Sequence, residues 1–253
     1  MQKTTPEQQI GAIYTTLARA WGRQHWWPAQ TPFEVIVGAY LTQNTHWINV
    51  EMALRRLRLA GVLSVSGIRR TSIRQLEKLI RSSGYFRQKA RRLKLFVQFL
   101  DRNYNGSLRK MFAQPSAKLR EELLLLNGVG AETADSILLY AGQHPIFVID
   151  AYTRRIAIRH GLASEDAKYD DLRTLFEEAL STTPTMADAG SASSGGGASH
   201  QPSRMSLARR SPLAQTFNEM HGLLVGVGKK HCLKSKAGCE ECPLQALLPA
   251  ARS

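Results

Sequence analysis

The stretch LNGVGAETADSILLYAGQHPIFVID, residues Leu126–Asp150, says more about the fold than any other part of the chain. Its Gly128-Val129-Gly130 turn separates two sets of apolar residues at helical spacing. These sets are Leu119, Leu123 and Leu126 before the turn, and Ala134, Ile137, Leu138 and Ala141 after it. The pattern predicts a helix over 118–126, a left-handed glycine at position 128 that ends it, and a second helix from about Ala131.

A turn of this kind can bind an anion. The backbone N–H groups from Val129 to Glu132 would point outwards at the positive end of the second helix's dipole. Gly130 would keep the turn tight. Ordinary corners between two helices also contain Gly-x-Gly, and the turn taken alone favours such a corner over an anion site.

Asp150 stands directly before residues 151–160, which have the pattern of a helix that ends at Gly161. Its side chain is therefore placed to cap that helix. The apolar run over 146–149 would hold it rigidly. A fixed carboxylate near a phosphate-binding turn also suits catalysis, so Asp150 has a structural and a catalytic interpretation.

The charge of the chain points to an acidic partner. Its 253 residues include 34 Lys and Arg against 20 Asp and Glu, a formal net charge of +14. Such an excess is typical of proteins that bind nucleic acid. We find no apolar run long enough to cross a bilayer and no secretory signal, and we expect an intracellular protein that does not contact membranes.

The periodicity of the chain predicts an all-α protein. Thr31-Pro32-Phe33-Glu34 has the pattern of a capping box with proline at the first helical position. Further helices are expected at about 72–83, 87–103, 169–180 and 213–227. Residues 182–211 are rich in Ser, Gly, Ala and Thr, and we predict a disordered insertion there. Its arginines at 204, 209 and 210 could touch DNA, although a passive linker is the simpler interpretation.

Several motifs, in this order, resemble those of the endonuclease III superfamily of helix-hairpin-helix DNA glycosylases. They are LTQNT (41–45), SSGYFRQKARRL (82–93), LNGVGAETA (126–134) and VIDAYTRRI (148–156). The resemblance implies two helical lobes with a DNA-binding cleft: a central lobe over 31–141, whose hairpin spans about 118–141, and a second lobe from 1–30, 142–181 and 212–231. It also implies a monomer that binds double-stranded DNA.

The resemblance assigns roles to single residues as well. DNA would contact the hairpin at Gly128, Val129, Gly130, Glu132 and Thr133, and Asp150 would be catalytic. Many members of the superfamily attack the sugar with a lysine in the second hairpin helix, where this chain has Glu132. A carboxylate cannot form a Schiff base. We therefore expect an enzyme that leaves an abasic site without cutting the strand, with Glu132 either orienting water or a base or serving as a surface residue.

Aromatic residues indicate the substrate. Trp26-Trp27-Pro28 precedes the first helix of the central lobe, and Trp47 follows LTQNT. Such tryptophans often serve only in packing, but their electron-rich faces also attract a cationic base such as 3-methyladenine. The pattern resembles the 3-methyladenine DNA glycosylase III branch, in which these residues stack on the flipped base. That branch also has a pocket lysine, which matches Lys229, or else Lys230.

Three cysteines form the motif C-x6-C-x2-C: Cys232, Cys239 and Cys242. Iron–sulfur members of the superfamily have the same spacing and a fourth cysteine five residues later, where this chain has Leu248. The motif over 232–243 is thus either an incomplete [4Fe-4S] loop or a remnant with free thiols. Zinc with His231 as fourth ligand is a weaker third choice.

The leading hypothesis is a monofunctional base excision repair glycosylase that flips out alkylated purines and hydrolyses the N-glycosidic bond. A mismatch or oxidised-base glycosylase is the alternative within the superfamily. A noncatalytic helix-hairpin-helix DNA-binding protein is the alternative outside the enzyme class.

Overall fold

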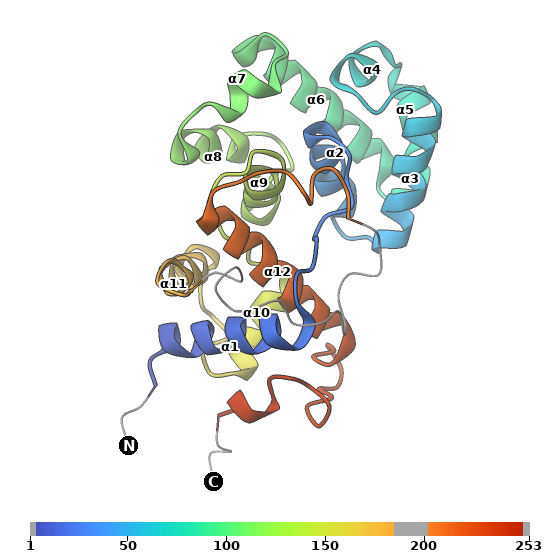
Figure 1. Cartoon of the computed structure of the whole chain (residues 1–253). Helices are drawn as coiled ribbons and strands as arrows, with labels where there is room; N and C mark the ends of the chain where they lie inside the picture. Colours follow the sequence, from blue (N-terminus) through green and yellow to red (C-terminus); the bar gives the residue numbers. More distant parts are fainter. Residues whose placement is uncertain (1–3, 185–201, 250–253) are drawn as a thin grey trace. The chain divides into compact units, whose positions relative to one another are not determined.

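The computed structural model describes residues 4–184 and 202–249. The protein is all-α, and within these residues the only β-type pairing is a bridge between Cys232 and Ala237. The chain divides into two compact units, one of residues 1–28 and 145–253 (unit 1) and one of residues 29–144 (unit 2) (Figure 1). No helix in the described part of the chain is both long and apolar enough to span a membrane.

Unit 2 contains eight α-helices in chain order together with one 3-10 and one π-helical segment. They are α2 (Pro32–Thr42), α3 (Trp47–Leu59), α4 (Val65–Arg70), α5 (Ile73–Leu79), η1 (Arg81–Ser83), α6 (Phe86–Tyr104), α7 (Leu108–Phe112), α8 (Ser116–Leu124), α9 (Ala131–Ser136) and the π-helical η2 (Ile137–Ala141). The core helix α2 is buried over residues 33–41 and packs against η2, α3 and α6. The helix expected over 72–83 is in fact α5 followed by the separate turn η1.

The start of α2 differs in one detail from the expected capping box. Thr31 Oγ1 accepts a hydrogen bond from the N–H of Glu34 at 3.1 Å, as expected. Glu34 does not complete the box, because its carboxylate accepts from the N–H of Gln30 at 3.0 Å and pairs with Arg58. The carboxylate is buried, so these partners compensate for its loss of water.

A buried lysine holds the end of α2 in place. Lys89, on α6, is 1% exposed, and its Nζ donates to the carbonyl groups of Leu41 at 2.8 Å and Ser83 at 2.6 Å. These bonds satisfy the Leu41 carbonyl in the last turn of α2, which has no partner within the helix. Lys89 therefore fixes the segment that follows α2, where Gln43 lies.

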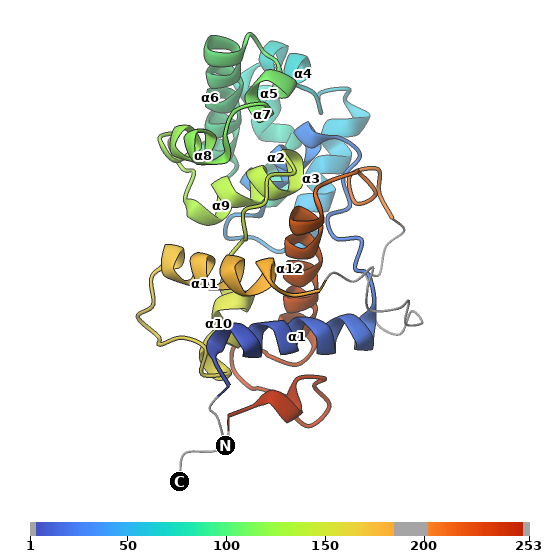
Figure 2. The ribbon, with the colours of Figure 1, turned by 60° about the vertical axis from the view of Figure 1, so that its left-hand side comes forward.

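Among its described residues, unit 1 contains α1 (Pro6–Trp21), α10 (Ala151–Arg159), α11 (Tyr169–Ser181), α12 (Pro212–Lys230) and the short η3 (Gln245–Leu247). Helix α1 packs against α11, and α10 packs against α12 (Figure 2). Phe147 lies at the centre of the core, stacked on Phe176 at 5.0 Å between ring centroids and edge-on to Phe217 at 5.6 Å. This packing anchors the segment that leads into Asp150.

Part of the expected insertion is ordered. Residues 185–201 lie outside the described residues, but residues 202–211 are part of unit 1 and form a turn flanked by segments without regular secondary structure. Ser203 is buried, and its hydroxyl donates to the carbonyl of Trp27 at 2.9 Å. Arg210 donates to the carbonyl of Met205 at 2.7 Å. The prediction of disorder was therefore wrong for 202–211, because Ser203 is tied to the distant Trp27 and Met205 is buried despite the low apolar content of the segment.

Candidate functional site

The glycine turn has the backbone that the sequence predicts at its first glycine. Gly128 has a φ of +79°, in the left-handed region, and α8 ends at Leu124, just before the turn. Gly130 behaves differently from the expectation. Its φ is −96°, and a Cβ built on it would have open space around it. Gly130 is therefore not needed to tighten the turn, and its missing side chain leaves room for a ligand to approach the backbone.

The set of backbone N–H groups that the turn leaves available also differs slightly from the expectation. The N–H of Val129 donates to the carbonyl of Leu126 at 3.0 Å, so it is used inside the turn. The first helical hydrogen bond of α9 runs from Ala134 to the carbonyl of Gly130 at 2.9 Å. The N–H groups of residues 130–133 lie at the start of α9, where no helical carbonyl can accept from them. The N–H groups available for an anion therefore begin one residue later than expected, at Gly130.

Two residues that sequence reasoning missed support the turn from within unit 2. Gln43 Nε2 donates to the carbonyl of Gly128 at 2.9 Å and to Thr133 Oγ1 at 3.0 Å. Arg92 Nη1 donates to Gln43 Oε1 at 2.9 Å. Gln43 and Arg92 belong to the LTQNT and YFRQKARRL segments, so those motifs help to shape the hairpin. The Thr133 side chain is buried in this network, which leaves only its backbone N–H to contact a ligand.

The Asp150 side chain caps α10, as its position predicts. Its Oδ1 accepts from the N–H of Thr153 at 2.7 Å, and the backbone of Asp150 is extended. The side chain is 13% exposed, so it is nearly buried yet can still be reached. Only one carboxylate oxygen is used by the cap, which leaves the second available for another partner.

That partner is a histidine that the sequence did not single out. His221 Nε2 lies 3.6 Å from Asp150 Oδ2, and the His221 ring is 5% exposed. Burial lowers the pKa of His221, and the neighbouring Asp150 carboxylate raises it in part. The ring also packs edge-on against Trp26 and Phe147, at centroid distances of 6.1 and 6.4 Å.

The predicted base-binding residues of unit 1 lie around Trp26. Lys229 Nζ lies 5.6 Å from the centroid of the Trp26 ring, while Lys230 lies over Trp21 instead. Trp26 Nε1 is buried without a hydrogen-bond partner in the described structure. Trp27 has a φ of +75°, which is unusual for a bulky residue, and its carbonyl is held by Ser203. In unit 1, Lys229 thus lies over Trp26, and Trp26 packs against His221. His221 in turn faces Asp150, so the contacts are continuous from Lys229 to the carboxylate.

The remaining predicted site residues belong to separate places. Pro28 is half-buried and ends the first segment of unit 1. Trp47 begins α3 in unit 2, where its indole N–H donates to Glu51 at 2.7 Å. Glu132 is exposed in the first turn of α9, also in unit 2, where its charge suits the helix dipole.

The cysteine segment, residues 232–248, does not fit a four-thiolate cluster. Cys232, Cys239 and Cys242 line a hollow of about 20 Å³, and Leu248 lines the same hollow at the place of the fourth ligand. That volume accommodates about one water molecule. Burial raises the pKa of the Cys242 thiol. Among the described residues, no group of three or more His, Cys, Asp or Glu side chains is arranged to hold a metal ion.

Hydrogen bonds from the body of unit 1 hold the cysteine segment instead. Arg159 Nη1 donates to Cys232 Sγ at 3.1 Å and to the carbonyl of Leu233 at 2.8 Å. Arg155 Nε donates to the carbonyl of Cys232 at 2.8 Å. Gln9 donates to the carbonyl of Leu247 at 3.2 Å. The chain therefore has contacts of its own that attach this segment to α1 and α10.

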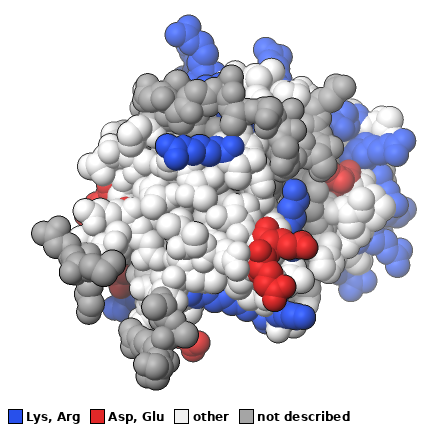
Figure 3. Space-filling view, turned by 60° about the horizontal axis from the view of Figure 1, so that its bottom comes forward, with Lys and Arg blue, Asp and Glu red and all other residues white. Residues whose placement is uncertain are grey.

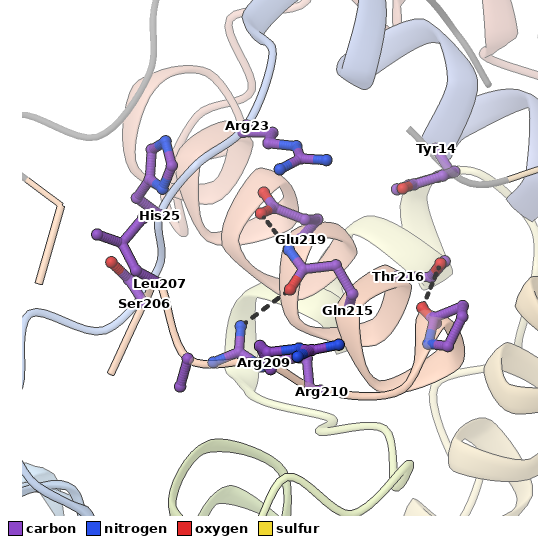
Figure 4. A pocket seen from close by; sticks show the side chains of 12 residues that line it. Tyr14, Arg23, His25, Ser206, Leu207, Arg209, Arg210, Gln215, Thr216 and Glu219 are labelled. Carbon is purple, nitrogen blue, oxygen red and sulfur yellow. Dashed lines mark hydrogen bonds between the residues drawn. The ribbon is translucent and has the colours of Figure 1, made fainter. Parts of the chain in front are cut away.

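A larger pocket in unit 1 lies apart from the predicted residues. It has a volume of about 380 Å³, and Glu219 projects into it from α12 among Arg23, Arg210 and Gln215 (Figure 4). Glu219 is buried and accepts from the N–H of Gln24 and from Gln215, both at 2.7 Å. Burial raises the pKa of the Glu219 carboxyl. None of the predicted site residues lines this pocket.

Basic side chains are spread over the protein surface. Figure 3 shows one face on which Lys and Arg occur at many places, whereas Asp and Glu are confined to a few. This distribution agrees with the net charge of +14 and suits contact with a polyanion.

The fold and these features define a helix-hairpin-helix protein with a nearly buried carboxylate, Asp150, at the start of α10. Residues 37–182 match the family described as HhH-GPD superfamily base excision DNA repair protein. A "Putative DNA repair glycosylase" of Methanocaldococcus jannaschii is 39% identical over 240 residues, covering 94% of each chain. The chain belongs to the HhH-GPD superfamily, and it is a base excision DNA glycosylase.

Solved structures agree with this assignment. The crystal structure of H. pylori 3-methyladenine DNA glycosylase bound to 1,N6-ethenoadenine has a TM-score of 0.68 and 25% identity, covering 89% of this chain and 98% of that one. A non-covalent endonuclease III–DNA complex has a TM-score of 0.71 at 22% identity, covering 98% and 96%, which shows a shared fold.

Proposed function

We propose that the protein is a monofunctional glycosylase that removes alkylated purines such as 3-methyladenine from double-stranded DNA. Asp150 carries the proposal. Its carboxylate is held by the N–H of Thr153 and is nearly buried. It faces His221, which in turn packs edge-on against Trp26. Cleavage of the N-glycosidic bond builds positive charge on the sugar, and a fixed carboxylate in a water-poor setting stabilises that charge.

The proposed absence of strand cleavage rests on Glu132. It occupies the place of the nucleophilic lysine in many members of the superfamily, and a carboxylate cannot form the Schiff base that leads to strand cleavage. Water then attacks the sugar, with Asp150 available to position it. The product is an abasic site.

The proposed substrate class rests on the surroundings of Trp26. A flat ring can stack on Trp26, and the buried side-chain polar atoms of unit 1 that lack a hydrogen bond in the described structure include Trp26 Nε1 and both amide atoms of Asn218. Such groups are costly unless a ligand satisfies them. Asn218 lies one turn before His221 on α12. A purine, with nitrogen donors and acceptors around its rings, matches these requirements.

The H. pylori relative supports the same choice, since that protein is a 3-methyladenine glycosylase whose structure contains 1,N6-ethenoadenine. A mismatch or oxidised-base substrate remains the alternative. No step of the reaction is assigned to an iron–sulfur cluster, because Leu248 and the small hollow do not fit one. We expect the cysteine segment to serve as structure, and the backbone N–H groups from Gly130 to Thr133 to hold DNA phosphates.

The test is base release from oligonucleotides that each contain one lesion. Methylated DNA carrying 3-methyladenine and a duplex with 1,N6-ethenoadenine should release the base, whereas duplexes with a thymine mismatch or 8-oxoguanine should not. Release of the base from only the thymine-mismatch and 8-oxoguanine duplexes would reject the proposed substrate class. A strand break without added base or heat would reject the monofunctional assignment.

A further inference from the structure

We propose that His221 is a positioning residue that holds the free oxygen of Asp150 and links it to the base-stacking face of Trp26. The proposal rests on the proposed function, because it presupposes Asp150 as the catalytic carboxylate. It adds a residue from α12 that neither the motifs nor the family description identifies.

The geometry around Asp150 carries the first step. One oxygen, Oδ1, is fixed by the N–H of Thr153 at 2.7 Å, while Oδ2 faces His221 Nε2 at 3.6 Å. That separation is slightly too long for a hydrogen bond. A shift of a few tenths of an ångström would bring Nε2–H into hydrogen-bond range. The Nε2–H tautomer would direct a donor at the carboxylate, whereas the opposite tautomer would set the Nε2 lone pair against it.

The rings that hold His221 carry the second step. Phe147 and Trp26 both pack edge-on against the imidazole, so it has little freedom to rotate. Trp26 approaches so closely to Gly222 that a Cβ there would lie 3.1 Å from Trp26 Cβ. A base stacked on Trp26 would thus be separated from His221 by the Trp26 ring alone. The Trp26 and His221 rings together would separate that base from the Asp150 carboxylate.

The charges around His221 define its protonation state. Asp150 at the start of α10 is the acidic group that faces the imidazole. On α12, Lys229 lies over the Trp26 ring, while Glu219 is turned towards Gln24 and Gln215. From α11, Glu177 accepts from the N–H of Phe147. Because burial also lowers the pKa of His221, the imidazole is neutral at neutral pH.

Acid would change this arrangement. A protonated His221 would form an ion pair with Asp150 and place a positive charge next to the carboxylate. The carboxylate would then stabilise the developing sugar cation less well, because like charges repel at short range. The proposal therefore predicts a loss of rate in acid, with a midpoint below the ordinary histidine pKa of about 6.5.

The test measures single-turnover release of 3-methyladenine across a range of pH in the full-length protein. His221→Phe keeps the ring and removes the donor, and we expect the rate to fall about tenfold to a hundredfold with DNA affinity unchanged. His221→Gln supplies an amide N–H close to the position of Nε2, so it should recover most of the rate. Its acid limb should move to lower pH, because the titrating imidazole is gone.

The matched control is His160→Phe. His160 is a second buried histidine of unit 1, and its Nδ1 lies 3.2 Å from the carbonyl of Leu247 in the cysteine segment. This variant should keep the wild-type pH profile even if it lowers stability. A wild-type rate in His221→Phe, or an unchanged acid limb in His221→Gln, would overturn the proposal. If Asp150→Asn stayed fully active, the fault would lie in the proposed function instead.

Discussion

Replacing the two glycines of the hairpin turn one at a time separates folding from DNA binding. Gly128→Ala forces an L-residue to a φ of +79°, at a cost of about 1–2 kcal/mol. The new methyl group would also lie 1.9 Å from Arg92 Nε, so the Arg92 side chain must move away. Arg92 then loses its bond to Gln43, which adds about 1–2 kcal/mol. We expect a total destabilisation of about 2–4 kcal/mol.

Gly130→Ala is the matched variant. Gly130 has an ordinary φ, and its new methyl group would meet open space, so the free energy of unfolding should change by less than about 1 kcal/mol. The methyl group would occupy the space through which a phosphate approaches, and DNA affinity should fall about tenfold. Urea unfolding followed by circular dichroism and fluorescence anisotropy with duplex DNA measure the two effects. Normal stability in Gly128→Ala, or normal affinity in Gly130→Ala, would refute the reasoning.

Three further predictions concern single side chains. Glu132→Lys should yield an enzyme–DNA adduct that borohydride traps, and the wild type should yield none; an adduct with the wild type would overturn the monofunctional assignment. Lys229→Gln removes a positive charge from the Trp26 face, so the rate of release of cationic 3-methyladenine should rise about fivefold relative to that of neutral 1,N6-ethenoadenine. An unchanged ratio of the two rates would argue against a cationic base on Trp26. Arg159→Ala should lower the free energy of unfolding by about 1–3 kcal/mol and expose Cys232 to thiol reagents, whereas unchanged thiol reactivity would show that other contacts hold the segment.

The sequence predicted those features that depend on neighbours along the chain. Helix α10 and its Asp150 cap follow from a cap residue and a periodic apolar face, and the left-handed Gly128 follows from the end of a helix. The supports of the site depend on residues far apart. Gln43 and Gly128 are 85 positions apart, and Ser203 and Trp27 are 176 apart. Periodicity and capping rules do not reach over such distances.

His221 shows the same limit within the candidate site. It stands in the middle of an apolar helix, where its sequence pattern is that of a core residue. Its relation to Asp150 arises only when α10 and α12 pack together. The interpretation of 202–211 as disordered failed for a related reason, since composition does not reveal that Ser203 holds the Trp27 carbonyl.

The most direct test of the account is the single-turnover rate of 3-methyladenine release by Asp150→Asn. Asparagine is as good an N-cap as aspartate, so α10 and the stability of unit 1 should be preserved. The substitution removes the negative charge that stabilises the sugar cation, and we expect the rate to fall at least about a hundredfold with unchanged DNA affinity. Release at the wild-type rate would contradict the central claim that the Asp150 carboxylate breaks the glycosidic bond.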